Sequence, residues 1–173
     1  MPASYQAPMV GDKTKDKHAS QSVSSNMTTE TARVEHLLQN KGNDAIAIAE
    51  TDTIATAVGI LRDKRIGALI VVDASHALAG ILSERDIVRK LAETPGQTLP
   101  QTVAENMTRD VVTCEPEDTL IKVLRRMSEG HFRHMPVVKG GKLMGMITIG
   151  DVINFRLNEL EHEALQLKQL IVG

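Results

Sequence analysis

Two stretches of the sequence match each other: Gly80-Ile-Leu-Ser-Glu-Arg-Asp86 and Gly145-Met-Ile-Thr-Ile-Gly-Asp151. The match continues towards the N-terminus at an offset of 65 or 66 residues, where Asp52-Thr-Ile54 aligns with Asp118-Thr-Leu120. Self-similarity at a fixed spacing is the signature of a repeated structural unit. The chain therefore contains two copies of one supersecondary unit, called repeat 1 and repeat 2 below.

Each repeat has the pattern of a strand, a helix, two strands and a second helix. Apolar residues recur at helical spacing in the first helices: Ile54, Ala57, Val58 and Leu61, then Leu120, Val123, Leu124 and Met127. The predicted strands are 45–49, 68–73 and 78–82 in repeat 1, and 111–114, 135–138 and 143–148 in repeat 2. Asp52 and Asp118 are the predicted N-caps. This order predicts an α/β (α+β) fold with a small mixed sheet and flanking helices in each repeat.

The repeats set the domain organisation. Residues 1–28 are polar and lack apolar periodicity, so we predict a disordered tail. Repeat 1 spans 29–97, repeat 2 spans 98–158, and 159–173 extend the last helix. Repeat 1 begins with a short helix that contains Val34, Leu37 and Leu38 and ends at Lys41-Gly42. Each repeat alone would bury a marginal core, so we expect the two to pack on each other.

Composition argues against several classes of function. The 20 Lys and Arg against 22 Asp and Glu, with 2% aromatic residues, disfavour nucleic acid. No apolar run reaches 18 residues, so we expect no membrane insertion. The single Cys114 cannot form an internal disulfide, which indicates a reducing, cytoplasmic location, and we interpret it as a core or pocket-lining residue. The histidine spacing predicts no metal site.

The motifs Ser83-x-x-Asp86 and Thr148-x-x-Asp151 stand where a strand meets a helix. One interpretation is a capping box, in which the hydroxyl and the acid satisfy backbone N–H groups at the helix start. The other is a ligand site, because a helix N-terminus favours phosphate and an Asp can accept bonds from ribose hydroxyls. The repetition of the pair in both repeats favours the second role without excluding the first.

A second group of candidates precedes the middle strand of repeat 2. Arg133 is a natural phosphate donor, and adjacent Arg133 and His134 are expected to point to opposite faces of a strand. Repeat 1 has Gly67-Ala68 there and supplies no cation, while Arg85 adds one at its helix start. The alternative is a solvated Arg beside a partly buried His.

Together with Gly130-His-Phe-Arg-His-Met-Pro-Val-Val138, these motifs resemble the tandem cystathionine-β-synthase (CBS) domain pair, or Bateman module, over about residues 31–165. The resemblance implies two units related by a pseudo-twofold axis, joined through their sheets and enclosing two clefts. It also implies a homodimer and regulatory, non-catalytic binding of adenosine-containing ligands such as AMP, ADP, ATP, S-adenosylmethionine or NADH.

The resemblance further implies roles for particular residues. Asp86 and Asp151 would hold ribose hydroxyls beside Ser83 and Thr148, and the cations would reach phosphate. Thr113, Met135 and Pro136 would line the adenine. The full set of candidates is Ser83, Arg85, Asp86, Thr113, Arg133, His134, Met135, Pro136, Thr148, Ile149 and Asp151. Because repeat 1 lacks the cation, we expect unequal sites, with the Asp151 site the one more readily occupied.

In the last helix, Leu157, Leu160, Ala164, Leu167 and Ile171 recur at heptad spacing. This stripe either packs on the chain's own core or mediates self-association. The sequence thus predicts a stand-alone energy or redox sensor with an unidentified protein target. The alternative is a structural interaction module with no physiological nucleotide. An enzyme that uses His131, His134 and Cys114 is disfavoured.

Overall fold

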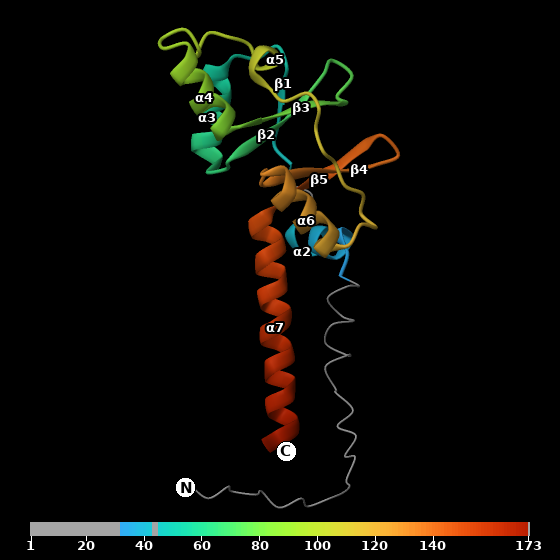
Figure 1. The fold of residues 1–173 in the computed structure, drawn as a ribbon. Coiled ribbons are helices and arrows are strands. Elements are labelled where there is room, and N and C mark those ends of the chain that lie inside the picture. The colour runs from blue at the N-terminus through green and yellow to red at the C-terminus, as the bar shows by residue number, and fades with distance from the viewer. Residues whose placement is uncertain (1–31, 43–44, 173) are drawn as a thin grey trace, which may run out of the picture.

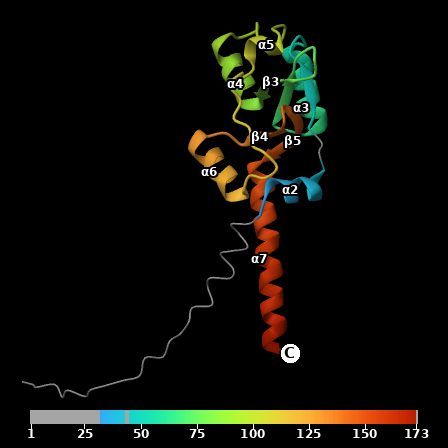
Figure 2. The same ribbon diagram turned by 90° about the vertical axis from the view of Figure 1, so that its right-hand side faces the viewer.

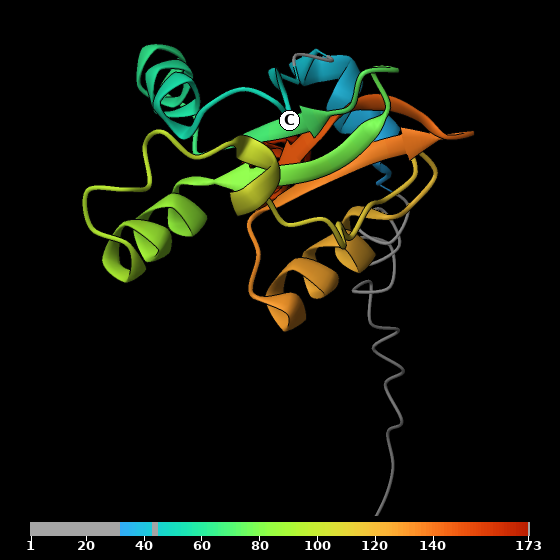
Figure 3. The same ribbon diagram turned by 90° about the horizontal axis from the view of Figure 1, so that it is seen from above.

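The structure is a computed structural model and describes residues 32–42 and 45–172. The predicted tail, residues 1–28, lies outside the described residues. Figures 1 and 2 show the two repeats stacked on each other, with a long helix leaving the body at one end. In the view of Figure 3, the strands of both repeats overlie one another at the centre, with helices at the periphery.

Repeat 1 contains a three-stranded sheet and two helices. Its elements are β1 (Ala47–Ala49), α3 (Ile54–Lys64), β2 (Ala68–Val72), β3 (Leu78–Ser83) and α4 (Glu84–Glu93). The strand order is β1-β2-β3, with β1 parallel to β2 and β2 antiparallel to β3. The predicted mixed sheet is therefore confirmed for this repeat.

Repeat 2 follows the same order with a shorter sheet. Its elements are α6 (Leu120–Gly130), β4 (His134–Lys139), β5 (Lys142–Thr148) and α7 (Ile149–Val172). Gly140 and Gly141 have φ of +56° and +75° at the tip of the β4–β5 hairpin, where the twist of the strands favours such turns.

The strand predicted at 111–114 is wrong in its extent. Only Cys114 pairs with the sheet, in a single parallel bridge to Val137. The preceding segment is held by the other repeat instead, because Thr108 and Ile81 exchange backbone hydrogen bonds of 2.9 and 3.0 Å. That pairing keeps residues 108–112 away from β4.

The predicted N-caps are one residue out of place. Thr53 and Thr119 cap α3 and α6, and their hydroxyls accept from the amides of Thr56 and Lys122. Asp52 and Asp118 close the preceding turns instead. Their carboxylates accept hydrogen bonds from backbone N–H groups three residues earlier, at 3.2 and 3.0 Å.

The leading helix of each repeat packs in the core of the other. α2 (Val34–Lys41) contributes Val34, Leu37 and Leu38 to a core whose other residues, apart from Ala32, come from repeat 2. α5 (Val103–Asn106) contributes Val103 to the core of repeat 1. Backbone hydrogen bonds fix both exchanges: Val34 N–H to Asp118 C=O and Val103 N–H to Asp52 C=O, at 3.0 and 2.8 Å. Each hydrophobic core therefore contains residues of both repeats.

Candidate functional site

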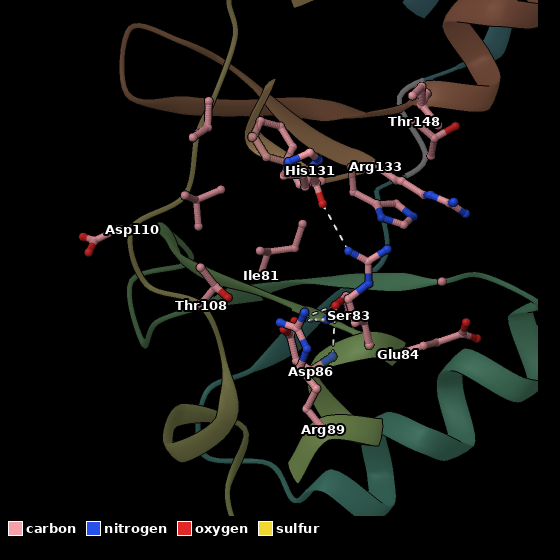
Figure 4. A pocket seen from close by; sticks show the side chains of 18 residues that line it. Ile81, Ser83, Glu84, Asp86, Arg89, Thr108, Asp110, His131, Arg133 and Thr148 are labelled. Carbon is pink, nitrogen blue, oxygen red and sulfur yellow. Dashed lines mark hydrogen bonds between the residues drawn. The ribbon is translucent and has the colours of Figure 1, made fainter. Parts of the chain in front are cut away.

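A cavity of about 680 Å³ lies between the two repeats. Four segments form its walls: the β3–α4 junction, residues 108–112, residues 130–134, and the β5–α7 junction. Gly67 also lines the cavity. In Figure 4, Ser83, Asp86 and Arg89 face His131, Arg133 and Thr148 across this space. Chain segments from both repeats are thus needed to enclose it.

The repeat 1 wall is the start of α4, where Ser83 and Asp86 form a capping box. The Asp86 Oδ2 accepts from the Ser83 N–H at 3.0 Å and from the Ser83 hydroxyl at 2.6 Å. The capping interpretation is therefore correct for this pair. A carboxylate has about four acceptor positions, so Asp86 keeps capacity for further donors while it faces the cavity.

Three guanidinium groups line the same cavity, those of Arg85, Arg89 and Arg133. Arg85 reaches across it, and its Nη1 donates to the His131 carbonyl at 3.1 Å. This bond links the start of α4 in repeat 1 to repeat 2. Arginine presents planar donors that match phosphate oxygens, and the helix dipole adds positive potential at the N-terminus of α4.

The ring of His134 lies against Gly67 of repeat 1, which has no side chain. A Cβ on Gly67 would lie only 3.3 Å from the His134 Cε1 and 3.4 Å from its Nε2. Burial, and after it the charge of Lys41, lowers the pKa of His134, although Asp151 and Glu84 act in the opposite direction. The ring is therefore neutral near pH 7 and can offer one donor and one acceptor.

In repeat 2, Asp151 has a different environment from Asp86. Its Oδ2 accepts from the Thr148 N–H at 2.8 Å, as in a capping box, and also from the Lys41 Nζ at 2.6 Å. Lys41 donates in addition to the Met146 carbonyl at 3.1 Å. Burial favours a higher pKa for Asp151, but the hydrogen bonds from Lys41 and Thr148 outweigh it and hold the pKa below its usual value. The carboxylate is an ion-pair partner, and it does not line the cavity.

Residues 34–93 and 102–158 each match the CBS domain. The chain belongs to the CBS domain family. One CBS domain lies within each repeat, and the arrangement of helices and small sheets matches solved CBS pairs. The predicted family and the predicted fold class are therefore confirmed.

Among solved structures, a CBS-domain containing protein from Agrobacterium tumefaciens is 38% identical with a TM-score of 0.71, and the match covers 73% of this chain and 94% of that protein. Among curated proteins, the mitochondrial CBS domain-containing protein CBSX3 of Arabidopsis thaliana is 30% identical, over 83% of this chain and 74% of its own length. Another curated relative, a 33.4 kDa protein of Thermofilum pendens, is longer: it is 38% identical, and the match covers 57% of this chain and 32% of that protein.

One further solved structure holds adenosine-containing ligands. The CBS domain pair of protein MJ0100, in complex with 5'-methylthioadenosine and S-adenosyl-L-methionine, is 27% identical with a TM-score of 0.66, over 75% of this chain and 98% of that one.

The CBS pair gathers seven of the eleven predicted ligand-binding residues at the cavity: Ser83, Arg85, Asp86, Arg133, His134, Thr148 and Ile149. Arg133 and His134 both line it, so the expectation of opposite faces is wrong. The reason is that β4 begins at His134, and Arg133 belongs to the turn before it.

Four predicted residues lie elsewhere. Met135 and Pro136 are buried inside β4, and Thr113 is half-buried outside the cavity wall. Asp151 faces Lys41, as described above. The cavity is therefore centred on the Ser83–Asp86 motif.

Sequence reasoning did not find several lining residues, among them Gly67, Glu84, Arg89, Thr108, Asp110, Val111 and Val112. The segment 108–112 precedes the first strand position of repeat 2 but lines a wall shared with repeat 1. A signal was available: two repeats that join about a pseudo-twofold axis place the segment leading into one repeat beside the helix start of the other.

Cys114 is 2% exposed. Burial, and to a smaller extent the charge of Asp118, raises the pKa of its thiol to about 12. Because the thiolate is the reactive form, this residue is a core residue and a poor nucleophile. Within the described residues, no three His, Cys, Asp or Glu side chains are placed to hold a metal ion together.

No helix among residues 32–42 and 45–172 is long and apolar enough to cross a bilayer.

Proposed function

We propose that this CBS pair is a non-catalytic regulatory module that binds an adenine nucleotide in the cavity at Asp86. The single observation that carries the proposal is one cavity lined by three arginines, by the N-terminus of α4 and by the acids Glu84, Asp86 and Asp110. Its volume of about 680 Å³ is in the range of small-molecule sites. The adenosyl ligands in the structure of MJ0100 support the ligand class.

In this proposal the ribose lies at Asp86, whose remaining acceptor positions take its two hydroxyls. The phosphates lie between Arg85, Arg89 and Arg133, near the N–H groups of α4. The apolar side chains of Ile81, Val111 and Val112 line the same cavity and provide a surface for the base. Charged donors that meet phosphate in a partly enclosed site bind it strongly.

The three arginines favour phosphate-bearing ligands, namely AMP, ADP, ATP or NADH, over adenosyl ligands without phosphate. A protein that distinguishes AMP from ATP senses energy, and one that binds NADH senses redox state. A ligand shifts the packing of the two repeats only by its different affinity for two arrangements. Arg85 is the candidate for this coupling, because its bond to the His131 carbonyl joins the repeats.

The sequence favoured the Asp151 site, and we now propose Asp86 as the principal one. The support is the cavity at Asp86 and the ion pair between Lys41 and Asp151, because Lys41 competes with ribose hydroxyls for the same oxygen. Thr148 and Ile149 then contribute from the opposite wall of the Asp86 cavity rather than as partners of Asp151.

We also propose that the protein acts as a homodimer in the cytoplasm, signals to a protein target and catalyses no reaction. A solved relative, a CBS-CP12 protein from bloom-forming cyanobacteria, is described as hexameric and is 27% identical with a TM-score of 0.62, over 70% of this chain and 69% of that one. The buried, unpaired Cys114 supports a reducing compartment. Its protonated thiol supports the absence of catalysis.

The test is a thermal-shift panel with AMP, ADP, ATP, NADH and S-adenosylmethionine at about 1 mM, on protein freed of copurified nucleotide. A ligand at about 100 times its dissociation constant adds about 2.7 kcal/mol, so the midpoint should rise by about 5–10 °C. Asp86→Asn keeps an N-terminal hydrogen-bonding side chain but removes the charge, and it should abolish most of the shift.

Two matched variants complete the test. Asp73→Asn changes an acid in the exposed β2–β3 turn, and it should leave the shift unchanged. Asp151→Asn should also retain most of it. If no ligand shifts the wild type, the sensor proposal fails and the structural interaction module remains, for which the exposed leucines of α7 are the supporting observation.

A further inference from the structure

The last helix, α7, leaves the body of the protein and exposes an apolar stripe. Figures 1 and 2 show its C-terminal part extending away from both repeats. Every residue from Leu157 to Ile171 is exposed to solvent except Glu159 and Glu163, which are half-buried. Leu167 is 61% exposed and Ile171 83%. The stripe therefore does not pack on the chain's own core.

The stripe begins on the body itself. Ile153, 46% exposed, and Leu157, 51% exposed, line a groove of about 180 Å³ between α6 and α7, whose other apolar lining includes Ile121 and Leu124. The stripe then continues without a break at alternating spacings of four and three residues: Ile153, Leu157, Leu160, Ala164, Leu167 and Ile171. This is the a/d pattern of a coiled coil, with Leu157, Ala164 and Ile171 at a.

The charged residues beside the stripe favour a second copy of α7 in parallel orientation as the partner. Arg156 and Glu163 occupy g positions, and Glu161 and Lys168 occupy e positions. In a parallel, in-register pair, each g residue faces the e residue five positions later on the other helix. Arg156 then meets Glu161 of a second molecule, and Glu163 meets Lys168. Both pairs are of opposite charge.

An antiparallel pair that overlaps the whole stripe is centred on residue 162. In this arrangement, Ile153 faces Ile171 and Leu157 faces Leu167 of the other molecule. The apolar residues therefore overlap as completely as they do in the parallel pair. Its flanking contacts, however, bring Glu161 and Glu163 each against its own counterpart. Like charges across such a seam are unfavourable. The charge pattern thus selects the parallel arrangement.

We propose that residues 153–171 of α7 form a parallel, in-register, two-stranded coiled coil with α7 of a second molecule of this chain. This inference rests on the proposed homodimer and gives it a surface and an orientation. The two bodies lie at the same end of the seam, with the α6–α7 grooves beside its beginning. Both nucleotide cavities of the dimer are then at one end of the assembly.

Cysteine crosslinking of the full chain tests the register. Leu160→Cys and Leu167→Cys, both at d positions, should each give a covalent dimer under mild oxidation. The two positions are about 10 Å apart along the helix, so an antiparallel pair can bring at most one of them opposite itself. His162→Cys, at an f position on the far side, is the matched control and should not crosslink. Wild-type Cys114 is buried and should not crosslink either.

Analytical ultracentrifugation of charge variants gives a second readout. Glu163→Lys opposes Lys168 of the second molecule and should weaken dimerisation about five-fold. The double variant Glu163→Lys/Lys168→Glu should restore the wild-type dissociation constant. A monomeric wild type overturns this inference together with the proposed homodimer. A dimer with one or neither cysteine position crosslinked overturns the α7 seam alone, and neither result affects the test of nucleotide binding.

Discussion

In repeat 1, Asp86 faces a cavity of about 680 Å³, whereas in repeat 2 the equivalent Asp151 is held by Lys41 at 2.6 Å. Both acids close a capping interaction at the start of a helix, with Ser83 in one case and Thr148 in the other. The local motif therefore sets the same local structure twice. The surroundings, which come from the other parts of the chain, set what each carboxylate can bind.

The difference originates in the exchanged leading helices. α2 has eight residues and ends at Lys41, close enough to repeat 2 for its ammonium group to reach Asp151. α5, its counterpart, has four residues and ends at Asn106. Repeat 1 consequently receives no lysine from α5, and Asp86 has no ion-pair partner among the described residues. The asymmetry depends on the length of one helix rather than on the acid motif.

Replacement of Lys41 should have the largest effect on the difference between the Asp86 and Asp151 sites. In Lys41→Met, the Asp151 carboxylate loses the donor that competes with ribose hydroxyls, so a second, weaker site should become available. Isothermal titration calorimetry with the nucleotide identified by the thermal-shift panel should show about two ligands per chain instead of about one. Lys139→Met, which removes an ion pair with Glu117 on the surface, is the control. A stoichiometry that stays at about one would mean that Lys41 does not separate the two sites.

The next effect concerns the arginines that we propose to bind phosphate. Arg85→Gln removes a charged donor, and charged hydrogen bonds contribute about 1.5–3 kcal/mol. Binding of ATP should weaken about ten-fold or more, while binding of adenosine should change less than about two-fold. Fluorescence or calorimetric titration of both ligands measures the difference. Arg62→Gln alters an exposed arginine paired with Asp63 and should change neither; an equal loss for both ligands would place Arg85 elsewhere than at phosphate.

The smallest effect is a pH dependence that arises at His134. Burial lowers its pKa in the folded protein below the ordinary value of 6.5. As the pH falls through that ordinary value, the unfolded chain takes up a proton that the folded chain resists, so stability is lost. His134→Gln should therefore lose less stability than the wild type between about pH 7.5 and pH 5.5.

Urea unfolding at the two pH values measures the His134 effect, and His162→Gln on the exposed part of α7 is the control. The groups that face His134 are Lys41, Arg133, Asp151 and Glu84. An unchanged pH dependence in His134→Gln would mean that folding does not lower the pKa of His134.

The sequence predicted the repeat, the element order and seven of the residues that line the cavity, because these depend on local patterns. The helices that begin after Ser83 and after Thr148 are examples, since capping is a property of a few adjacent residues. The single bridge of Cys114 could not be foreseen in this way, because pairing between Thr108 and Ile81 draws the strand away. The ion pair of Asp151 with Lys41, 110 residues away in the chain, is likewise a tertiary contact.

The exchange of α2 and α5 also determines the order in which the protein can form during synthesis. α2 is made first, but its backbone partners at Pro116 and Asp118 follow about 80 residues later. The core of repeat 1 likewise stays incomplete until Val103 and Met107 leave the ribosome. Repeat 1 cannot complete its core until the first part of repeat 2 has been translated, so translation ending between the repeats would produce an aggregation-prone fragment and not a smaller folded domain.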